Sequence, residues 1–224
     1  MTSPNLNSTS SEPEAYQIGW IPFLGATIYL DSHPLIPRTE TEWWVEQCIK
    51  TIPTDRPVRV LDLFSGSGCV GVAVLLHTPN THVTFAELVP AHCETIKKNI
   101  AANTIDQSRT TVVESNVWSA VSGTYDLILA NPPYLAESRR ARIEDSVLIH
   151  EPHAALFADK DGFALIEATI EGLPEHLSVG GHCWIEHEPE HATEIHESAQ
   201  RLGLSTSTHQ DQYRVERYSV ILKP

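Results

Sequence analysis

The chain has 224 residues, of which 41% are hydrophobic and 20% are charged, and its formal net charge is −14. Such values are typical of one globular domain with a sizeable core. The longest apolar run, Cys69–Leu76, is far shorter than the roughly 20 residues of a membrane span. Proteins that grip a phosphate backbone usually carry a basic surface, so the acidic charge disfavours nucleic acid as a direct partner.

The N-terminal segment and the cysteines indicate the cellular compartment. Residues 1–14 contain no basic or apolar stretch, which predicts a disordered tail and not a secretory signal. Cys48, Cys69, Cys93 and Cys183 are far apart and form no Cys-x-x-Cys pair. This spacing favours reduced thiols in a cytoplasmic protein over a zinc ribbon or a redox motif.

The remaining elements are expected in the following order. Tyr16–Leu30 mixes β-branched and aromatic residues with glycines, which predicts a β-hairpin within an extension of residues 15–37. A helix is expected from about Thr41. From residue 58 to 224 apolar strands alternate with helices, which predicts a Rossmann-like α/β core with a doubly wound, mostly parallel sheet. Strands are expected at residues 58–63, 83–87, 111–114, 125–130, 181–186 and 218–222, and helices near 70–77, 91–102, 163–176 and 190–202.

A glycine loop follows the first of these strands. Gly66-x-Gly68-x-x-Gly71 matches the dinucleotide fingerprint, and Glu87 closes the second strand about 20 residues later. Glycines let the backbone approach a ligand, and the N–H groups of the next helix point at it. Glu87 is expected to accept hydrogen bonds from the two hydroxyls of a ribose.

The residues around the loop favour a ligand with a single nucleoside over a dinucleotide. Asp62 closes the first strand, where a carboxylate would repel a diphosphate but suits the ammonium and sulfonium charges of S-adenosylmethionine. After the third strand, Asn116 is expected to hydrogen-bond the adenine edge and Trp118 to pack on the adenine face or to serve as an ordinary core aromatic.

The motif Asn131-Pro132-Pro133-Tyr134 follows the fourth strand of the core, at the sheet edge where such folds place their ligands. An amide or exocyclic amine is a poor nucleophile because its lone pair is delocalised. The Asn131 side-chain oxygen and the Pro132 carbonyl can each accept one of its N–H bonds, which aims the nitrogen at a methyl donor and stabilises the charge that develops. The prolines fix both acceptors, and Tyr134 offers a flat stacking surface.

Together, "LDLFSGSG", "NPPY", "LIPRTETE" and "HEPHAALFADKDG" resemble the release-factor glutamine methyltransferase family, of the PrmC/HemK type, from about Tyr16 to the C-terminus. The resemblance implies a class I methyltransferase sheet with one antiparallel strand, S-adenosyl-L-methionine as cofactor, and methylation of the glutamine in the Gly-Gly-Gln loop of peptide-chain release factors. It implies that the donor contacts Asn131 together with Phe64, Ser65, Gly66, Ser67, Gly68, Glu87 and Trp118. It also implies that residues 131–134 hold the glutamine and that Arg38 lies near the mouth of the site.

Two departures from the family pattern bear on the substrate. The family usually has a helical N-terminal domain that helps to dock the release factor. Here only the tail and the hairpin extension are expected before the catalytic part of the methyltransferase domain, which spans residues 15–224. Docking is therefore expected to be weaker, to use other surfaces, or to need a helper protein that replaces that domain. Asn116 stands where many relatives have aspartate.

Other readings stay open on the sequence alone. A methyltransferase for the exocyclic amine of a nucleic-acid base would share the chemistry, an NAD(P)-dependent oxidoreductase would share the glycine pattern, and a non-catalytic adaptor would keep the fold without turnover. "HEPEH" (residues 187–191) matches a zinc-protease pattern, but Pro189 suits the start of a new helix, so the two histidines are not expected to share a face and no metal site is predicted. "SRRAR" (residues 138–142) is the one basic run.

Overall fold

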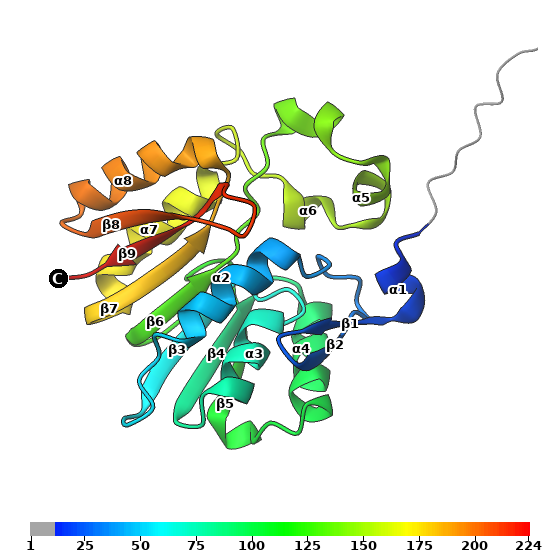
Figure 1. Cartoon of the computed structure of the whole chain (residues 1–224), viewed down its shortest axis with the longest axis horizontal. Helices are drawn as coiled ribbons and strands as arrows, with labels where there is room; N and C mark the ends of the chain where they lie inside the picture. The colour runs from blue at the N-terminus through cyan, green and yellow to red at the C-terminus, as the bar shows by residue number, and fades with distance from the viewer. Residues whose placement is uncertain (1–11) are drawn as a thin grey trace, which may run out of the picture.

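The computed structural model describes residues 12–224, and a seven-stranded sheet forms its centre (Figure 1). The strand order is β5-β4-β3-β6-β7-β9-β8. Strand β9 runs antiparallel to both of its neighbours, and all other pairs are parallel. The predicted doubly wound, mostly parallel sheet with one antiparallel strand is therefore confirmed. The strands are β3 (Val58–Leu63), β4 (Thr81–Glu87), β5 (Thr110–Glu114), β6 (Tyr125–Ala130), β7 (Leu177–Glu186), β8 (Ser205–Gln210) and β9 (Glu216–Leu222).

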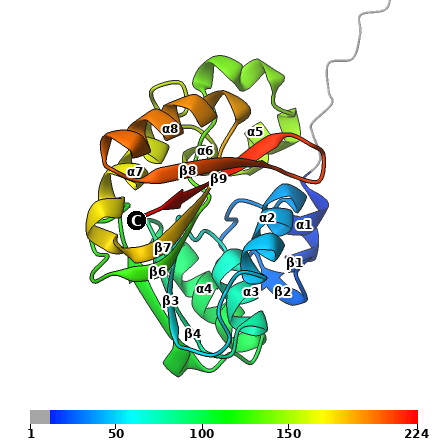
Figure 2. The ribbon, with the colours of Figure 1, turned by 60° about the vertical axis from the view of Figure 1, so that its left-hand side comes forward.

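Helices cover both faces of this sheet, as Figures 1 and 2 show. One face carries α2 (Thr39–Ile49), α3 (Cys69–His77) and α4 (Pro90–Ala102), and the other carries α7 (Ala164–His176) and α8 (Ala192–Arg201). Short 3-10 turns at Gln107–Arg109, Glu137–Arg142 and Pro189–His191 join some of these elements.

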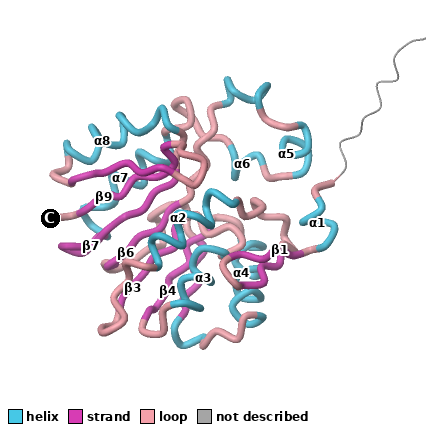
Figure 3. The backbone as a smooth tube through the Cα atoms, in the orientation of Figure 1, coloured by secondary structure: helices cyan, strands magenta, loops and turns pink. Residues whose placement is uncertain are grey.

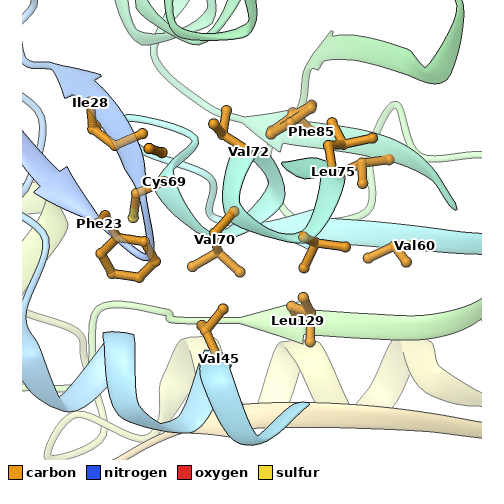
Figure 4. Close-up of a cluster of buried hydrophobic side chains, with 14 of the residues drawn as sticks. Phe23, Ile28, Val45, Val60, Cys69, Val70, Val72, Leu75, Phe85 and Leu129 are labelled. Atoms are coloured by element: carbon orange, nitrogen blue, oxygen red, sulfur yellow. The ribbon is translucent and has the colours of Figure 1, made fainter. Parts of the chain in front are cut away.

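The two faces bury two separate hydrophobic clusters, because successive side chains of a strand point in opposite directions. In β3, Val60 packs into the first cluster, whereas Leu61 and Leu63 pack into the second. Figure 4 shows the first cluster, in which the α3 side chain of Val70 lies between the hairpin and Val45 of α2.

The N-terminal extension forms a helix and a hairpin that pack beside α3 and α4 (Figure 1). Strands β1 (Trp20–Phe23) and β2 (Ala26–Tyr29) confirm the predicted hairpin. Residues expected to belong to its first strand instead form α1 (Glu14–Ile18), which Gly19 ends with a φ of 85°. The predicted tail of residues 1–14 lies largely outside the described residues, and its last residue already begins α1.

The segment between β6 and α7 projects beyond the carboxyl ends of the parallel strands, as the tube in Figure 3 shows. It contains α5 (Asp145–His150) and α6 (His153–Leu156), neither of which the sequence predicted. Backbone hydrogen bonds attach it to the strand exit: Leu135 N–H donates to Leu156, and Ala158 N–H donates to Leu135. Within residues 12–224, no helix is both long enough and apolar enough to cross a membrane.

Candidate active site

The glycine loop after β3 is a tight turn in which every second residue from Phe64 to Gly68 has a left-handed backbone conformation. Phe64, Gly66 and Gly68 have φ angles of 61°, 54° and 78°. A Cβ on Gly68 would lie 3.1 Å from Ile96 of α4, so this position favours glycine for both its angle and its packing. Ser65 fastens the turn, because its hydroxyl donates to the Asp62 carbonyl at 2.7 Å.

Residues of this loop divide into those that face the cavity and those that build the turn. Phe64 and Gly66 line an open cavity at the carboxyl ends of the strands. The other predicted donor contacts lie beneath it: Ser65 and Ser67 are buried, and the Asp62 carboxylate accepts the Gly71 N–H at 2.9 Å. Asp62 therefore holds the first turn of α3. Burial is the main reason that the pKa of its carboxyl rises to about 7; the Gly71 hydrogen bond opposes this rise, and the nearby Glu87 adds to it.

Glu87 ends β4 and lines the same cavity. Its Oε2 accepts the Gly66 N–H at 2.7 Å and its Oε1 accepts the Val89 N–H at 2.9 Å. An ionised carboxylate has about four lone-pair positions, so two contacts leave room for two more donors. Glu87 therefore shapes the loop and keeps acceptor capacity toward a ligand diol.

The turn after β5 separates two predicted donor contacts. The Ser119 hydroxyl accepts the Asn116 N–H at 2.9 Å, and the Ser115 hydroxyl donates to the Val117 carbonyl at 2.8 Å. This turn places Asn116 and Val117 in the cavity lining, whereas Trp118 packs on α7 and donates to the Ala168 carbonyl at 2.8 Å. The structure therefore does not bring Trp118 to the cavity, and its core role prevails.

The Asn131–Tyr134 motif follows β6, which pairs in parallel with β3, so it lies beside the glycine loop. Asn131 and Pro133 line the cavity, and Pro132 is buried beside them. The Asn131 Nδ2 donates to the Thr41 hydroxyl of α2 at 3.2 Å. The Tyr134 hydroxyl donates to Glu186 at 2.8 Å. Burial and the neighbouring Glu186 charge raise the pKa of Tyr134 well above its usual range, so this phenol stays protonated.

Glu186 is a component of the site that the sequence analysis missed. This residue ends β7, is 1% exposed, and accepts hydrogen bonds from Thr41, Trp44 and Tyr134. Burial raises its pKa, and these three hydrogen bonds oppose that rise. An acidic residue that closes an apolar strand is the signal that identified Glu87, and it applies equally to "HCWIE".

Arg38 does not line the cavity; it forms an ion pair with Glu151, and this pair is called the clamp. Its guanidinium lies 2.6 Å from the carboxylate of Glu151, whose other oxygen accepts the Ile36 N–H at 3.1 Å. This pair joins the "LIPR" segment to the "HEP" segment. Further residues line the cavity that the sequence did not indicate. They lie in or just after the two segments, or follow β4 and β5: Leu35, Leu88, Val89, His92, Val117, Pro152, Ala154 and Ala155.

The histidines of "HEPEH" have separate partners. The ring of His187 lies 2.8 Å from the Ser219 hydroxyl, and that of His191 lies 3.2 Å from the Asp161 carbonyl. In the described part of the chain, no group of three or more potential ligands could hold a metal ion. All four cysteines are free and buried.

The combined arrangement suits a nucleoside. An acid at the end of β4, bare backbone at Gly66, and an apolar slot at Leu88 and Val117 fit a ribose and a purine, while the Asn131 amide faces the same cavity from β6. Among the described residues, no lysine or arginine lines the cavity.

Comparisons with known proteins agree with this chemistry. The family model "Methyltransferase small domain" matches residues 46–163. The release factor glutamine methyltransferase of Bordetella pertussis is 32% identical over 213 residues, which cover 94% of this chain and 77% of that protein. The enzyme of that name from Streptococcus pneumoniae is 32% identical over 175 residues, 78% of this chain.

Two further findings concern the length of the relatives and the fold of a solved structure. The chain spans only 61% of the length of the Streptococcus pneumoniae protein and 65% or less of several other relatives with the same name. The N-terminal domain of human METTL16, solved in complex with SAH, matches 88% of this chain and 75% of its own with a TM-score of 0.62 and 16% identity, which supports the fold. By its sequence, its sheet and its family model, this chain belongs to the release factor glutamine methyltransferase family.

Proposed function

We propose that this protein transfers a methyl group from S-adenosyl-L-methionine to the side-chain amide nitrogen of a glutamine in a peptide-chain release factor, in its Gly-Gly-Gln loop. The observation that carries the proposal is the placement of Asn131 beside the glycine loop, with its amide nitrogen committed to Thr41. That contact leaves the Asn131 oxygen as an acceptor for an incoming NH2 group.

The residues around the cavity support distinct parts of this reaction. Glu87, Gly66 and Asn116 are the proposed donor contacts, and Asn131 with the Pro132 carbonyl would accept the two N–H bonds of the glutamine. S-adenosylmethionine supplies a methyl group on a positively charged sulfur. As the nitrogen–carbon bond forms and the sulfur–carbon bond breaks, the positive charge moves to the nitrogen, where these two oxygens stabilise it. The amide then releases one proton to water, so no general base is required.

The test is mass spectrometry of a release factor after incubation with enzyme and methyl donor. We expect a shift of one methyl group on the Gly-Gly-Gln peptide, and no incorporation of label into tRNA, rRNA or DNA. Label in nucleic acid without label in the release factor would contradict the proposal. Binding of NADH in preference to S-adenosylmethionine would contradict it as well, and binding of the donor without methylation of any component of a cell extract would indicate an adaptor.

Two variants sharpen the test. Asn131→Ala should retain donor binding but lower kcat by at least about a hundredfold, as expected for a preorganised group that stabilises developing charge. A kcat within about tenfold of the wild type, about 1.4 kcal/mol of barrier, would refute the two-acceptor mechanism. Asp55→Asn, an exposed residue before β3, is the matched control. Because release factors act in translation, the proposed activity belongs to the cytoplasm. If the predicted helper protein exists, addition of cell extract should increase the rate of release-factor methylation.

A further inference from the structure

Glu186 lies outside the cavity lining, yet it contacts Tyr134 of the Asn131–Tyr134 motif directly and reaches Asn131 through Thr41 of α2. On one side Tyr134 donates to Oε1 at 2.8 Å. On the other side Oε2 accepts from the Trp44 indole at 2.6 Å and from the Thr41 hydroxyl at 2.7 Å. An acid with 1% exposure and three donors is a built feature of the fold, because burial of an unpaired carboxylate would be costly.

The direction of these hydrogen bonds can be deduced from the donors available. The Trp44 indole N–H can only donate, so Oε2 must act as an acceptor. The Thr41 hydroxyl has a single hydrogen, which it gives to the same oxygen. Toward Asn131, 3.2 Å away, Thr41 therefore offers only lone pairs. The end of the Asn131 amide that faces Thr41 must be the NH2 group.

We propose that Glu186 is a positioning residue that acts through Thr41 to fix the orientation of the Asn131 amide. In that orientation the Asn131 oxygen is presented to the substrate. The opposite orientation would present an NH2 group, which would repel the NH2 of a glutamine and favour a carboxylate. This inference rests on the proposed function and adds to it: the Glu186–Thr41 pair selects an amide nitrogen as the group that is methylated.

The hydrogen bonds from Glu186 through Thr41 to Asn131 form a relay. This relay needs an acceptor at the Thr41 side of residue 186 and does not need a charge there. In Glu186→Gln, the Trp44 N–H would hold the amide oxygen on its own side, where the Thr41 hydroxyl also binds, and the new NH2 group would face Tyr134. Glu186→Gln should therefore preserve the relay, whereas Glu186→Leu should remove it. Thr41→Ser and Thr41→Val form a second such pair, with and without the hydroxyl.

The first experiment measures kcat on a Gly-Gly-Gln peptide together with donor affinity by calorimetry. We expect the Gln and Ser variants to stay within about tenfold of the wild-type kcat. We expect the Leu and Val variants to lose at least about a hundredfold in kcat while donor affinity stays within about threefold. Val45→Ala is the control for stability alone, because Val45 is buried in the first cluster on the same helix as Thr41 and its side chain makes no contact in the relay. It should lower the urea midpoint and leave kcat within about threefold. A Thr41→Val kcat within about tenfold of wild type overturns the proposal.

The second experiment needs no substrate. In protein labelled with ¹⁵N-asparagine, the side-chain NH2 of Asn131, assigned with Asn131→Asp, should give shifted and exchange-protected proton signals in wild type and in Thr41→Ser. Thr41→Val should lose both properties. Unchanged Asn131 signals in Thr41→Val overturn the relay whatever the activity does. If the wild-type enzyme leaves the Gly-Gly-Gln peptide unmethylated, the proposed function fails, and this spectrum still decides the orientation of Asn131.

Discussion

Asp62 offers a quantitative test of how the glycine loop is supported. Its side chain is buried beneath the loop, and its folded-state pKa of about 7 lies above the unfolded value of 3.8. A raised carboxyl pKa contributes stability that is fully present below the unfolded pKa and is lost as the pH rises through the folded pKa. Three pKa units correspond to about 4 kcal/mol at most, of which about 2 to 3 kcal/mol falls between pH 5 and 8.

The change to make is Asp62→Asn, which keeps an oxygen to accept the Gly71 N–H but cannot ionise. Urea unfolding of wild type and variant at pH 5, 6, 7 and 8 gives the difference in free energy of unfolding at each pH. We expect the variant to gain on the wild type by about 2 to 3 kcal/mol over this range. Asp55→Asn, which alters an exposed residue, should show no such trend. A difference constant to within about 1 kcal/mol would show that the Asp62 carboxylate is not desolvated, and would refute the structural role assigned to it.

Three other changes probe the rest of the site. Glu87→Ala should weaken binding of S-adenosylmethionine by at least about tenfold in calorimetry, and an unchanged affinity would remove this residue from the donor site. Gly162→Ala should lower the free energy of unfolding by at least about 1 to 3 kcal/mol, because φ is +92° and a Cβ would lie 2.1 Å from the Tyr134 carbonyl oxygen; equal urea midpoints would contradict this packing. Arg38→Ala should leave Glu151 without its cation and speed amide hydrogen exchange in α5 and α6, whereas unchanged exchange would show that the clamp does not hold this segment.

Much of the sheet could be predicted because its central strands are buried on both faces. Strands β3 and β6 match their predicted bounds at both ends, since short apolar runs buried on both faces leave little ambiguity. Strand β8, with the sequence STSTHQ, is polar and exposed at the sheet edge, and only its pairing with β9 makes it a strand. The short helices α5 and α6 likewise depend on contacts with the rest of the fold.

Some residues of the site could likewise be predicted from the sequence, and others could not. Gly66, Glu87 and Asn131 could be assembled from the sequence, because the carboxyl ends of parallel strands meet at one edge of a sheet. Trp118 could not be placed, since serine hydrogen bonds in its turn decide which way the ring points. The contacts of Glu186 could not be predicted, because two of its three partners lie more than 140 residues earlier in the chain and no local pattern reports such contacts.

This long separation also has a consequence for biosynthesis. Thr41 and Glu186 are 145 residues apart, so the hydrogen-bonded core of the site cannot form until most of the chain has left the ribosome. A nascent chain that ends before β7 would contain the glycine loop and the Asn131–Tyr134 motif but would lack Glu186, the carboxylate proposed to orient the Asn131 amide. Catalytic competence is thus expected to appear late in synthesis, when the last parallel strand adds to the sheet.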